Sequence, residues 1–293
     1  MIDGDERPVL VLSDLHLGRT GMVERGAELT SLVEGASMLV VNGDVAELHV
    51  ERWAEDAARE LDRLRSLCRA SGTRLVLLAG NHDPDLTDLR HLILAGGELL
   101  ITHGDAVHEA LAPWSDAAAV IRDRHREVLA AAPAERRHDL DTLFEACREA
   151  ALAECEHQGD LGRPTSPLGA VAKPWKIAAI TGFWWSYARR LDRFASTHAP
   201  TARVILAGHT HRAGVERAGR RTIVNTGCFG IPGPALGALV TADGLEVRRI
   251  LRGRDRRRTL GTDAIHHDPR IRFVPADLAR LSELCRANEV DAA

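Results

Sequence analysis

Residues 75–85 read LVLLAGNHDPD, an apolar run that ends abruptly in polar residues. The apolar part has the length and composition of a strand that is buried on both faces of a sheet. Asn81, His82 and Asp83 follow a single glycine, and Pro84 prevents the strand from continuing. The stretch therefore predicts a buried strand that presents an amide, an imidazole and a carboxylate at its carboxyl end.

Apolar runs of this kind recur along the chain and alternate with helical patterns. Buried strands are predicted at 8–13, 37–44, 73–80, 98–105 and 202–211, and short antiparallel strands at 221–227, 237–243 and 244–251. Helices are predicted at 24–34, 51–72 and 275–289. The helix at 51–72 is the clearest, because its apolar residues repeat every three or four positions and Gly72 suits a C-terminal cap. This alternation predicts a layered α/β protein.

The composition changes between residues 106 and 200. This segment is alanine-rich, holds four of the five tryptophans and the only tyrosine, and shows helical patterns at 120–132, 139–157 and 175–196 with a Gly/Pro-rich break at 158–169. We predict a helical insertion with its own small core inside a single domain that spans 1–293. Two interpretations stay open for the insertion. It is either a cap with an apolar groove and a basic rim for substrate, or a subdomain whose aromatic residues fill its own core.

The overall composition is that of a globular protein, with 45% apolar and 27% charged residues in a chain of 293. A net charge of −4 gives no general preference for nucleic acid or membranes. The five cysteines form no CxxC pair, which fits a reducing compartment. The polar start MIDGDERPVL does not resemble a signal peptide, and no apolar run reaches about 18 residues. We expect a cytoplasmic protein, and peripheral association with the inner membrane face stays open.

Polar side chains follow five of the apolar runs. Because ligands bind beyond the carboxyl ends of strands in open α/β sheets, we expect these side chains to converge on one sheet edge. Each short motif alone would fit a simple turn. Together, their buried carboxylates and imidazoles would be costly to desolvate without a cation. The candidate residues are Asp14, His16, Asp44, Asn81, His82, Asp83, His103, Asp105, His209 and His211.

These donors are too many for one ion and enough for two. Oxygen and nitrogen ligands without thiolate suit Mn, Fe, Zn, Co or Ni. A carboxylate shared by two ions about 4 Å apart would form the two-metal clamp that is used in phosphate ester hydrolysis. The sequence therefore predicts two divalent metal ions, with Mn²⁺ or Fe favoured and Zn²⁺, Ni²⁺ or Co²⁺ as alternatives.

The ordered motifs SDLHLG, NGD, GNHD, THGD and GHTH resemble those of the calcineurin-like metallophosphoesterase superfamily, over about residues 8–105 and 202–228. The resemblance implies a four-layer α-β-β-α sandwich, here with the helical insertion between the fourth and fifth motifs. It also implies a set of metal ligands: Asp14, His16 and His211 for the first ion, Asn81, His103 and His209 for the second, and Asp44 as the bridge between them.

The activity that the resemblance implies is hydrolysis of a phosphate mono-, di- or pyrophosphate ester by a metal-bridging hydroxide. His82 would face the substrate and either stabilise the developing charge or protonate the leaving oxygen, a task worth about 10²- to 10⁴-fold in rate. A carboxylate would orient His82, and the sequence leaves open whether Glu47 or Asp83 does so.

The substrate stays open at this stage. UDP-2,3-diacylglucosamine hydrolases are similar in SDLHL, HGD and GHTH, but their main group carries arginine where His82 stands. A nuclease is an alternative, with RRILRGRDRRR (248–258) as a phosphate-contacting patch. We prefer to interpret that stretch as a charged hairpin and expect no nucleic-acid partner. A non-catalytic metal-binding scaffold is the alternative of another class. No obligate protein partner is evident.

Overall fold

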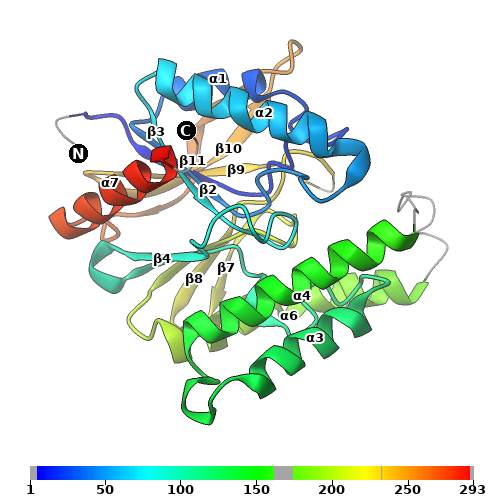
Figure 1. Ribbon diagram of the computed structural model, residues 1–293. Coiled ribbons are helices and arrows are strands. Elements are labelled where there is room, and N and C mark those ends of the chain that lie inside the picture. Colours follow the sequence, from blue (N-terminus) through cyan, green and yellow to red (C-terminus); the bar gives the residue numbers. More distant parts are fainter. Residues whose placement is uncertain (1–4, 162–173, 232, 291–293) are drawn as a thin grey trace.

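The computed structural model describes residues 5–161, 174–231 and 233–290 and has two β-sheets at its centre (Figure 1). The strands of the six-stranded sheet are, in spatial order, β11 (Arg258–Asp268), β10 (Gly244–Arg252), β9 (Leu236–Thr241), β1 (Val9–Leu12), β2 (Met38–Asn42) and β3 (Arg74–Leu78). Those of the five-stranded sheet are β4 (His91–Leu94), β5 (Leu99–Thr102), β6 (Val204–Ala207), β8 (Arg221–Asn225) and β7 (Gly214–Ala218).

The central strands are parallel and buried on both faces. β1, β2 and β3 run parallel, as do β5, β6 and β8. Val9 and Val11 belong to the core between the two sheets, whereas Leu10 and Leu12 belong to the core under the helices. Since successive side chains of a strand point to opposite faces, burial of both faces requires the unbroken apolar runs seen in the sequence.

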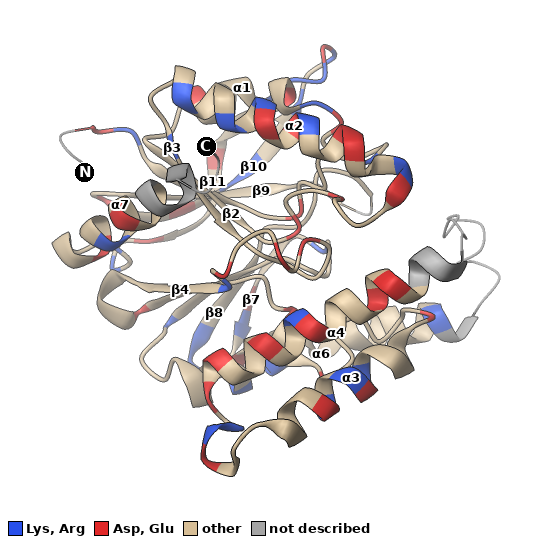
Figure 2. Ribbon diagram, viewed as in Figure 1, with Lys and Arg blue, Asp and Glu red and all other residues tan. Residues whose placement is uncertain are grey.

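Helices α1 (Thr30–Glu34) and α2 (Glu51–Ala70) cover the outer face of the six-stranded sheet (Figure 1). In α2, Leu61 and Leu64 are buried against the sheet, and charged residues mark its outward surface (Figure 2). The C-terminal helix α7 (Pro275–Val290) packs beside β3, where Leu281 joins the core between the sheets. Short 3₁₀ helices lie at Gly26–Leu29, Ala95–Gly97, Asp105–Val107 and Ala134–Arg136.

The predicted insertion forms the outer helical layer of the five-stranded sheet. It contains α3 (Ala118–Ala131), α4 (Leu140–Leu161) and α6 (Pro174–His198). The expectation of a separate small core is wrong, because Phe144 and Leu191 pack in one cluster with Leu100 and Ile205 of the sheet. The predicted α/β fold with its order of helix, sheet, sheet and helix is confirmed. Residues 162–169 of the predicted Gly/Pro-rich break lie outside the described residues.

Several strands differ from the expectation. Three strands were not predicted from the sequence: β4, β7 and β11 all lie at a sheet edge and carry exposed or half-buried residues. The run at 221–227 was expected to be antiparallel, but β8 pairs in parallel with β6 and antiparallel only with β7. Among the described residues, no helix is long and apolar enough to cross a membrane.

Candidate metal centre

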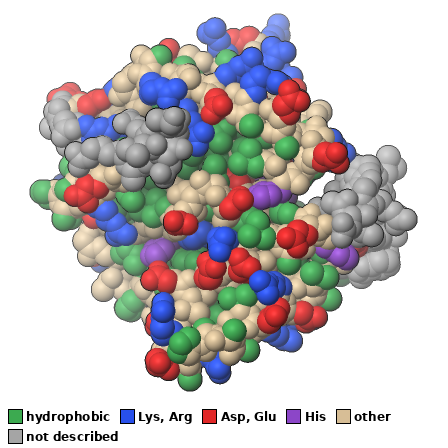
Figure 3. All heavy atoms as spheres, viewed as in Figure 1, with side chains coloured by type: hydrophobic (Ala, Val, Ile, Leu, Met, Phe, Trp, Pro, Cys, Tyr) green, Lys and Arg blue, Asp and Glu red, His purple; other side chains and the backbone are tan. Residues whose placement is uncertain are grey.

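The polar motifs meet where the carboxyl ends of strands from both sheets face each other. The loops after β1, β2 and β3 leave the six-stranded sheet, and the loops after β5 and β6 leave the five-stranded sheet. The expectation of a single sheet edge is therefore wrong, because the chain crosses to the second sheet after β3. Figure 3 shows histidine side chains at the surface in the band between the two helical layers.

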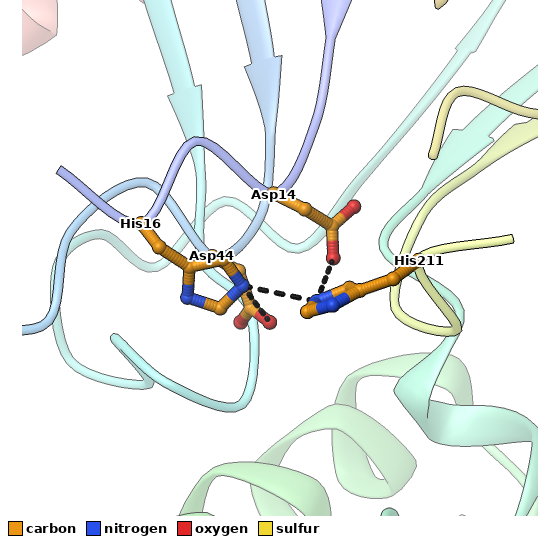
Figure 4. A group of neighbouring side chains, drawn as sticks. All are labelled: Asp14, His16, Asp44 and His211. Carbon is orange, nitrogen blue, oxygen red and sulfur yellow. Dashed lines mark hydrogen bonds and ion pairs between the residues drawn. The ribbon is translucent and has the colours of Figure 1, made fainter. Parts of the chain in front are cut away.

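Asp14, His16, Asp44 and His211 form the first group of donors, and their ligand atoms all lie within 4.8 Å of one another (Figure 4). The Nε2 atoms of His16 and His211 are 3.0 Å apart. His211 Nε2 lies 3.3 Å from Asp14 Oδ1, and His16 Nε2 lies 3.7 Å from Asp44 Oδ2. The four residues predicted for the first ion and the bridge are thus brought together.

Asn81, His103 and His209 form the second group. Asn81 Oδ1 lies 2.9 Å from His209 Nδ1 and 3.2 Å from His103 Nε2. His103 Nε2 also lies 3.3 Å from Asp44 Oδ2. Because the same Asp44 oxygen approaches His16 of the first group, Asp44 stands between the two groups, in the position that a bridging carboxylate needs.

The backbone at this centre is held in an uncommon conformation. A positive φ costs energy for residues other than glycine and marks functional sites when the surrounding structure maintains it. Two glycines are required by space rather than by φ. A Cβ at Gly80 would collide with the carboxylate of Asp44, and a Cβ at Gly208 with that of Asp14. Five predicted metal ligands have positive φ: Asp14 (51°), His16 (46°), Asp44 (50°), His209 (67°) and His211 (58°).

Three of the four imidazoles have one nitrogen engaged away from the centre. His16 Nδ1 donates to Glu47 Oε1 at 2.9 Å, His103 Nδ1 to the carbonyl of Asn42 at 3.1 Å, and His209 Nε2 to the carbonyl of Leu111 at 3.1 Å. A neutral imidazole that donates from one nitrogen presents a lone pair at the other. Such outer hydrogen bonds are typical of metal-ligating histidines. When these imidazoles are neutral, as metal ligation requires, their second nitrogens turn lone pairs toward the centre.

The lone pairs of His209 Nδ1 and Asn81 Oδ1 need a positive charge between them. His209 Nδ1 and Asn81 Oδ1 are both acceptors in this arrangement, yet they lie 2.9 Å apart. Burial and the neighbouring His103 lower the pKa of His209 to about 4, so a proton on His209 does not supply that charge at neutral pH. A divalent cation satisfies both acceptors at once. The donor set of oxygens and imidazoles fits Mn, Fe, Zn, Co or Ni.

The buried carboxylates give the centre its negative charge. Burial alone would raise the pKa of Asp44, but His103 and His82 outweigh it and hold that pKa well below its usual range. Burial likewise opposes protonation of His103, and Asp44 nevertheless raises its pKa to about 10. The negative charge of Asp44 is therefore balanced by protonated neighbours. A bound metal cation would supply that balancing positive charge instead.

His82 lies at the open side of the centre and is oriented by Glu47. His82 Nδ1 is 3.1 Å from Glu47 Oε2, and the His82 side chain is 36% exposed while that of Glu47 is 1% exposed. Asp83 lies elsewhere: its Oδ1 accepts from the Gly80 amide at 2.7 Å, and its Oδ2 accepts from the Val45 amide at 2.5 Å. The candidate catalytic role of Asp83 is therefore corrected, because its carboxylate joins two loops of the backbone.

Sequence reasoning missed the support that the helical layer gives to the histidine loops. The Tyr187 hydroxyl oxygen on α6 lies 3.1 Å from the carbonyl oxygen of Gly208 and 3.3 Å from that of His103, so its one proton is shared between the two loops. The Trp114 ring lies 5.5 Å from that of His209. The cluster GFWWSYARR was a visible signal, but its pattern did not reveal which aromatic residue reaches the loops. Asp105 is not among the donors, since it pairs with Arg90 at 2.9 Å.

The comparisons with known proteins agree with these motifs. A model of the calcineurin-like phosphoesterase family matches residues 7–213, more than half of the chain. The chain belongs to this family of phosphoesterases. The Asp/His cluster adds a candidate binding site for divalent metal. Together they support a metal-dependent phosphoesterase.

Solved structures similar to this chain are distant in sequence. Vacuolar protein sorting 29 from Cryptosporidium parvum is 13% identical, with 88% of this chain and 97% of that chain covered and a TM-score of 0.39. A predicted phosphoesterase from Streptococcus pneumoniae is 15% identical, with coverage of 89% and 98% and a TM-score of 0.38. A dimetal phosphatase from Danio rerio is 14% identical, with coverage of 83% and 96% and a TM-score of 0.39. No curated protein sequence matches the chain.

Proposed function

We propose that this protein hydrolyses phosphate esters with two divalent metal ions, and that Mn²⁺ or Fe occupies the centre. The observation that carries the proposal is the position of Asp44 Oδ2, 3.7 Å from His16 Nε2 in one donor group and 3.3 Å from His103 Nε2 in the other. Bound ions would act as Lewis acids on phosphoryl oxygens and lower the pKa of water from 15.7 to about 7.

The residues of the chain have separate tasks in this proposal. Asp14, His16 and His211 would hold one ion, Asn81, His103 and His209 the other, and Asp44 both. His82 does not join either group. Burial opposes protonation of His82, but Glu47 raises its pKa to about 9, so with Nδ1 engaged by Glu47 the Nε2 atom also carries a proton that it can donate to the leaving oxygen. The buried position of Glu47 keeps water from competing for that hydrogen bond.

Metal removal and reconstitution test the proposal. Protein treated with a chelator should lose hydrolysis of bis-p-nitrophenyl phosphate, and Mn²⁺ should restore it with about two ions bound per chain by elemental analysis. His82→Ala should keep both ions and lose rate on esters with poor leaving groups. His138→Ala, an exposed histidine of the helical layer, is the control. Metal-loaded protein that hydrolyses neither mono- nor diesters would refute the proposal and favour a scaffold.

For the narrower substrate class we propose a pyrophosphate of the UDP-diacylglucosamine type. The motif likeness supports it, together with the exposed apolar side chains of Ile177 and Trp185 on α6, which suit a lipid and a peripheral position at the inner membrane face. Hydrolysis of a UDP-linked pyrophosphate at least as fast as bis-p-nitrophenyl phosphate would support this class. Cleavage of simple esters alone would contradict it.

The nuclease alternative gains no support from the arginine-rich stretch. Residues 248–258 form the end of β10, a turn and the start of β11. Paired arginines offer fewer free charges to phosphates. The pairs in and around this hairpin are Arg248 with Glu246, Arg256 with Glu24 and Glu28, Arg257 with Asp255, and Arg258 with Glu28.

A further inference from the structure

Arg19 is a cation at the rim of the centre that the proposed mechanism does not use. It directly follows the motif SDLHLG, and its backbone amide donates to the carbonyl of His16 at 3.1 Å. Its Nη1 donates to Glu47 Oε1 at 2.8 Å, and its guanidinium carbon lies 5.3 Å from the centre of the Trp53 ring. A turn, an ion pair and an aromatic ring therefore hold the guanidinium in place.

Arg19 and His82 share one carboxylate. Glu47 offers Oε1 to Arg19 and Oε2 to His82, so the two cationic side chains stand next to each other. Both are partly exposed, Arg19 at 31% and His82 at 36%, whereas Asp14 and His16 are completely buried. Arg19 therefore faces the same open side of the centre from which His82 would meet the substrate.

The guanidinium has more donors than Glu47 uses. Arginine carries five N–H groups, and Nη1 provides the bond to Glu47. Within the described part of the chain, no other acceptor bonds to the Arg19 guanidinium, and the Trp53 contact uses the ring face rather than a hydrogen bond. Glu47 also has two imidazole donors, so Arg19 is not needed to satisfy it. A planar fork with spare donors is suited to an anionic group with two oxygens.

We propose that Arg19 binds a second anionic group of the substrate, a phosphoryl or carboxyl group close to the phosphoryl group under attack. Arg19 thereby determines specificity for doubly anionic esters over simple ones. This inference rests on the proposed function, because it places the reacting phosphoryl group at the metal centre beside His82. The proposed contact acts on ground-state binding, so loss of Arg19 should change the affinity for substrates and inhibitors.

Binding of small anions tests this role without any turnover. Calorimetry on protein saturated with Mn²⁺ would compare inorganic phosphate, methylenediphosphonate and phosphonoacetate at a fixed excess of Mn²⁺. We expect Arg19→Gln to weaken the binding of methylenediphosphonate or phosphonoacetate by about tenfold, which corresponds to the loss of one charge-assisted contact. The binding of phosphate should weaken by less than twofold. The phosphonate that loses more affinity identifies the second group as phosphoryl or carboxyl. Arg19→Lys should restore part of the affinity.

Arg52→Gln is the matched control, because Arg52 also stacks on Trp53, at 3.8 Å, and should leave all three affinities unchanged. Equal weakening of phosphate and both phosphonates by Arg19→Gln would overturn the proposal and assign Arg19 a structural role through Glu47. No weakening at all would overturn it too. Since the affinities are measured without hydrolysis, protein that binds the anions selectively but hydrolyses no ester refutes the proposed function alone.

Discussion

Replacement of Glu47 by glutamine tests how the buried carboxylate controls His82. Glu47 accepts hydrogen bonds from His16 Nδ1 at 2.9 Å, Arg19 Nη1 at 2.8 Å and His82 Nδ1 at 3.1 Å. The glutamine amide has one carbonyl oxygen, and its NH₂ group would point a donor at a nitrogen that must itself donate. Burial lowers the pKa of His82 and Glu47 raises it, so loss of the Glu47 charge leaves fewer His82 rings with a proton on both nitrogens and lowers the fraction that can donate from Nε2 to the leaving oxygen.

The expected loss follows from one hydrogen bond. A hydrogen bond to a charged group contributes about 1.5–3 kcal/mol. Each ~1.4 kcal/mol corresponds to a factor of ten in rate. Glu47→Gln should therefore lower kcat by roughly 10- to 150-fold on an alkyl ester, whose leaving group needs a proton. The loss on a p-nitrophenyl ester should be much smaller, because that leaving group departs without protonation.

The assay compares kcat for both esters at saturating Mn²⁺, with Mn²⁺ affinity measured by calorimetry. His16 also contacts Glu47, so metal affinity is expected to fall by about tenfold, within the range for residues that support ligands. Saturating metal removes that contribution from kcat. Equal losses on the two esters would refute the reasoning, as would wild-type kcat on the alkyl ester.

Three further variants separate metal binding, loop geometry and the ion pair of a buried carboxylate with an exposed arginine. Asp44→Asn should bind fewer than two Mn²⁺ per chain by elemental analysis and lose nearly all hydrolysis, because both donor groups share its Oδ2; two ions bound with normal rate would contradict the bridge. Asp83→Asn should lower the free energy of unfolding in urea by about 2–4 kcal/mol, because its buried carboxylate accepts three backbone amides; an unchanged midpoint would contradict this. Asp268→Asn should lower the free energy of unfolding by about 1 kcal/mol at pH 6 and by clearly less at pH 2. Hydrogen bonds from Arg270 lower the pKa of Asp268 to about 2, so this contribution is complete above about pH 4 and is lost as the pH falls through about 2; a cost as large at pH 2 as at pH 6 would contradict it.

The sequence predicts the strands that carry the centre because their burial on two faces leaves unbroken apolar runs. It does not predict β4, β7 or β11, whose partly exposed residues lack that pattern. The residue pattern brings the seven candidate ligands into one list, and the family resemblance divides them into two groups around Asp44. The distances between the two groups follow only from the facing of the two sheets. The sequence does not decide whether Glu47 or Asp83 orients His82, because both residues follow the end of a strand. Only the direction of each side chain decides between them.

The carboxylates of the centre hold loops as well as facing the donor groups. Asp44 Oδ1 accepts from the His82 amide at 2.9 Å, while its Oδ2 faces His16 and His103. Asp14 accepts from the His209 amide at 3.0 Å and also contacts His211. Each carboxylate thus ties one ligand-bearing loop to another, which maintains the positive φ at these residues against its cost. A metal ion that binds here would meet a geometry already set by backbone hydrogen bonds, so loss of metal should leave the loops in place, whereas loss of a carboxylate should release them.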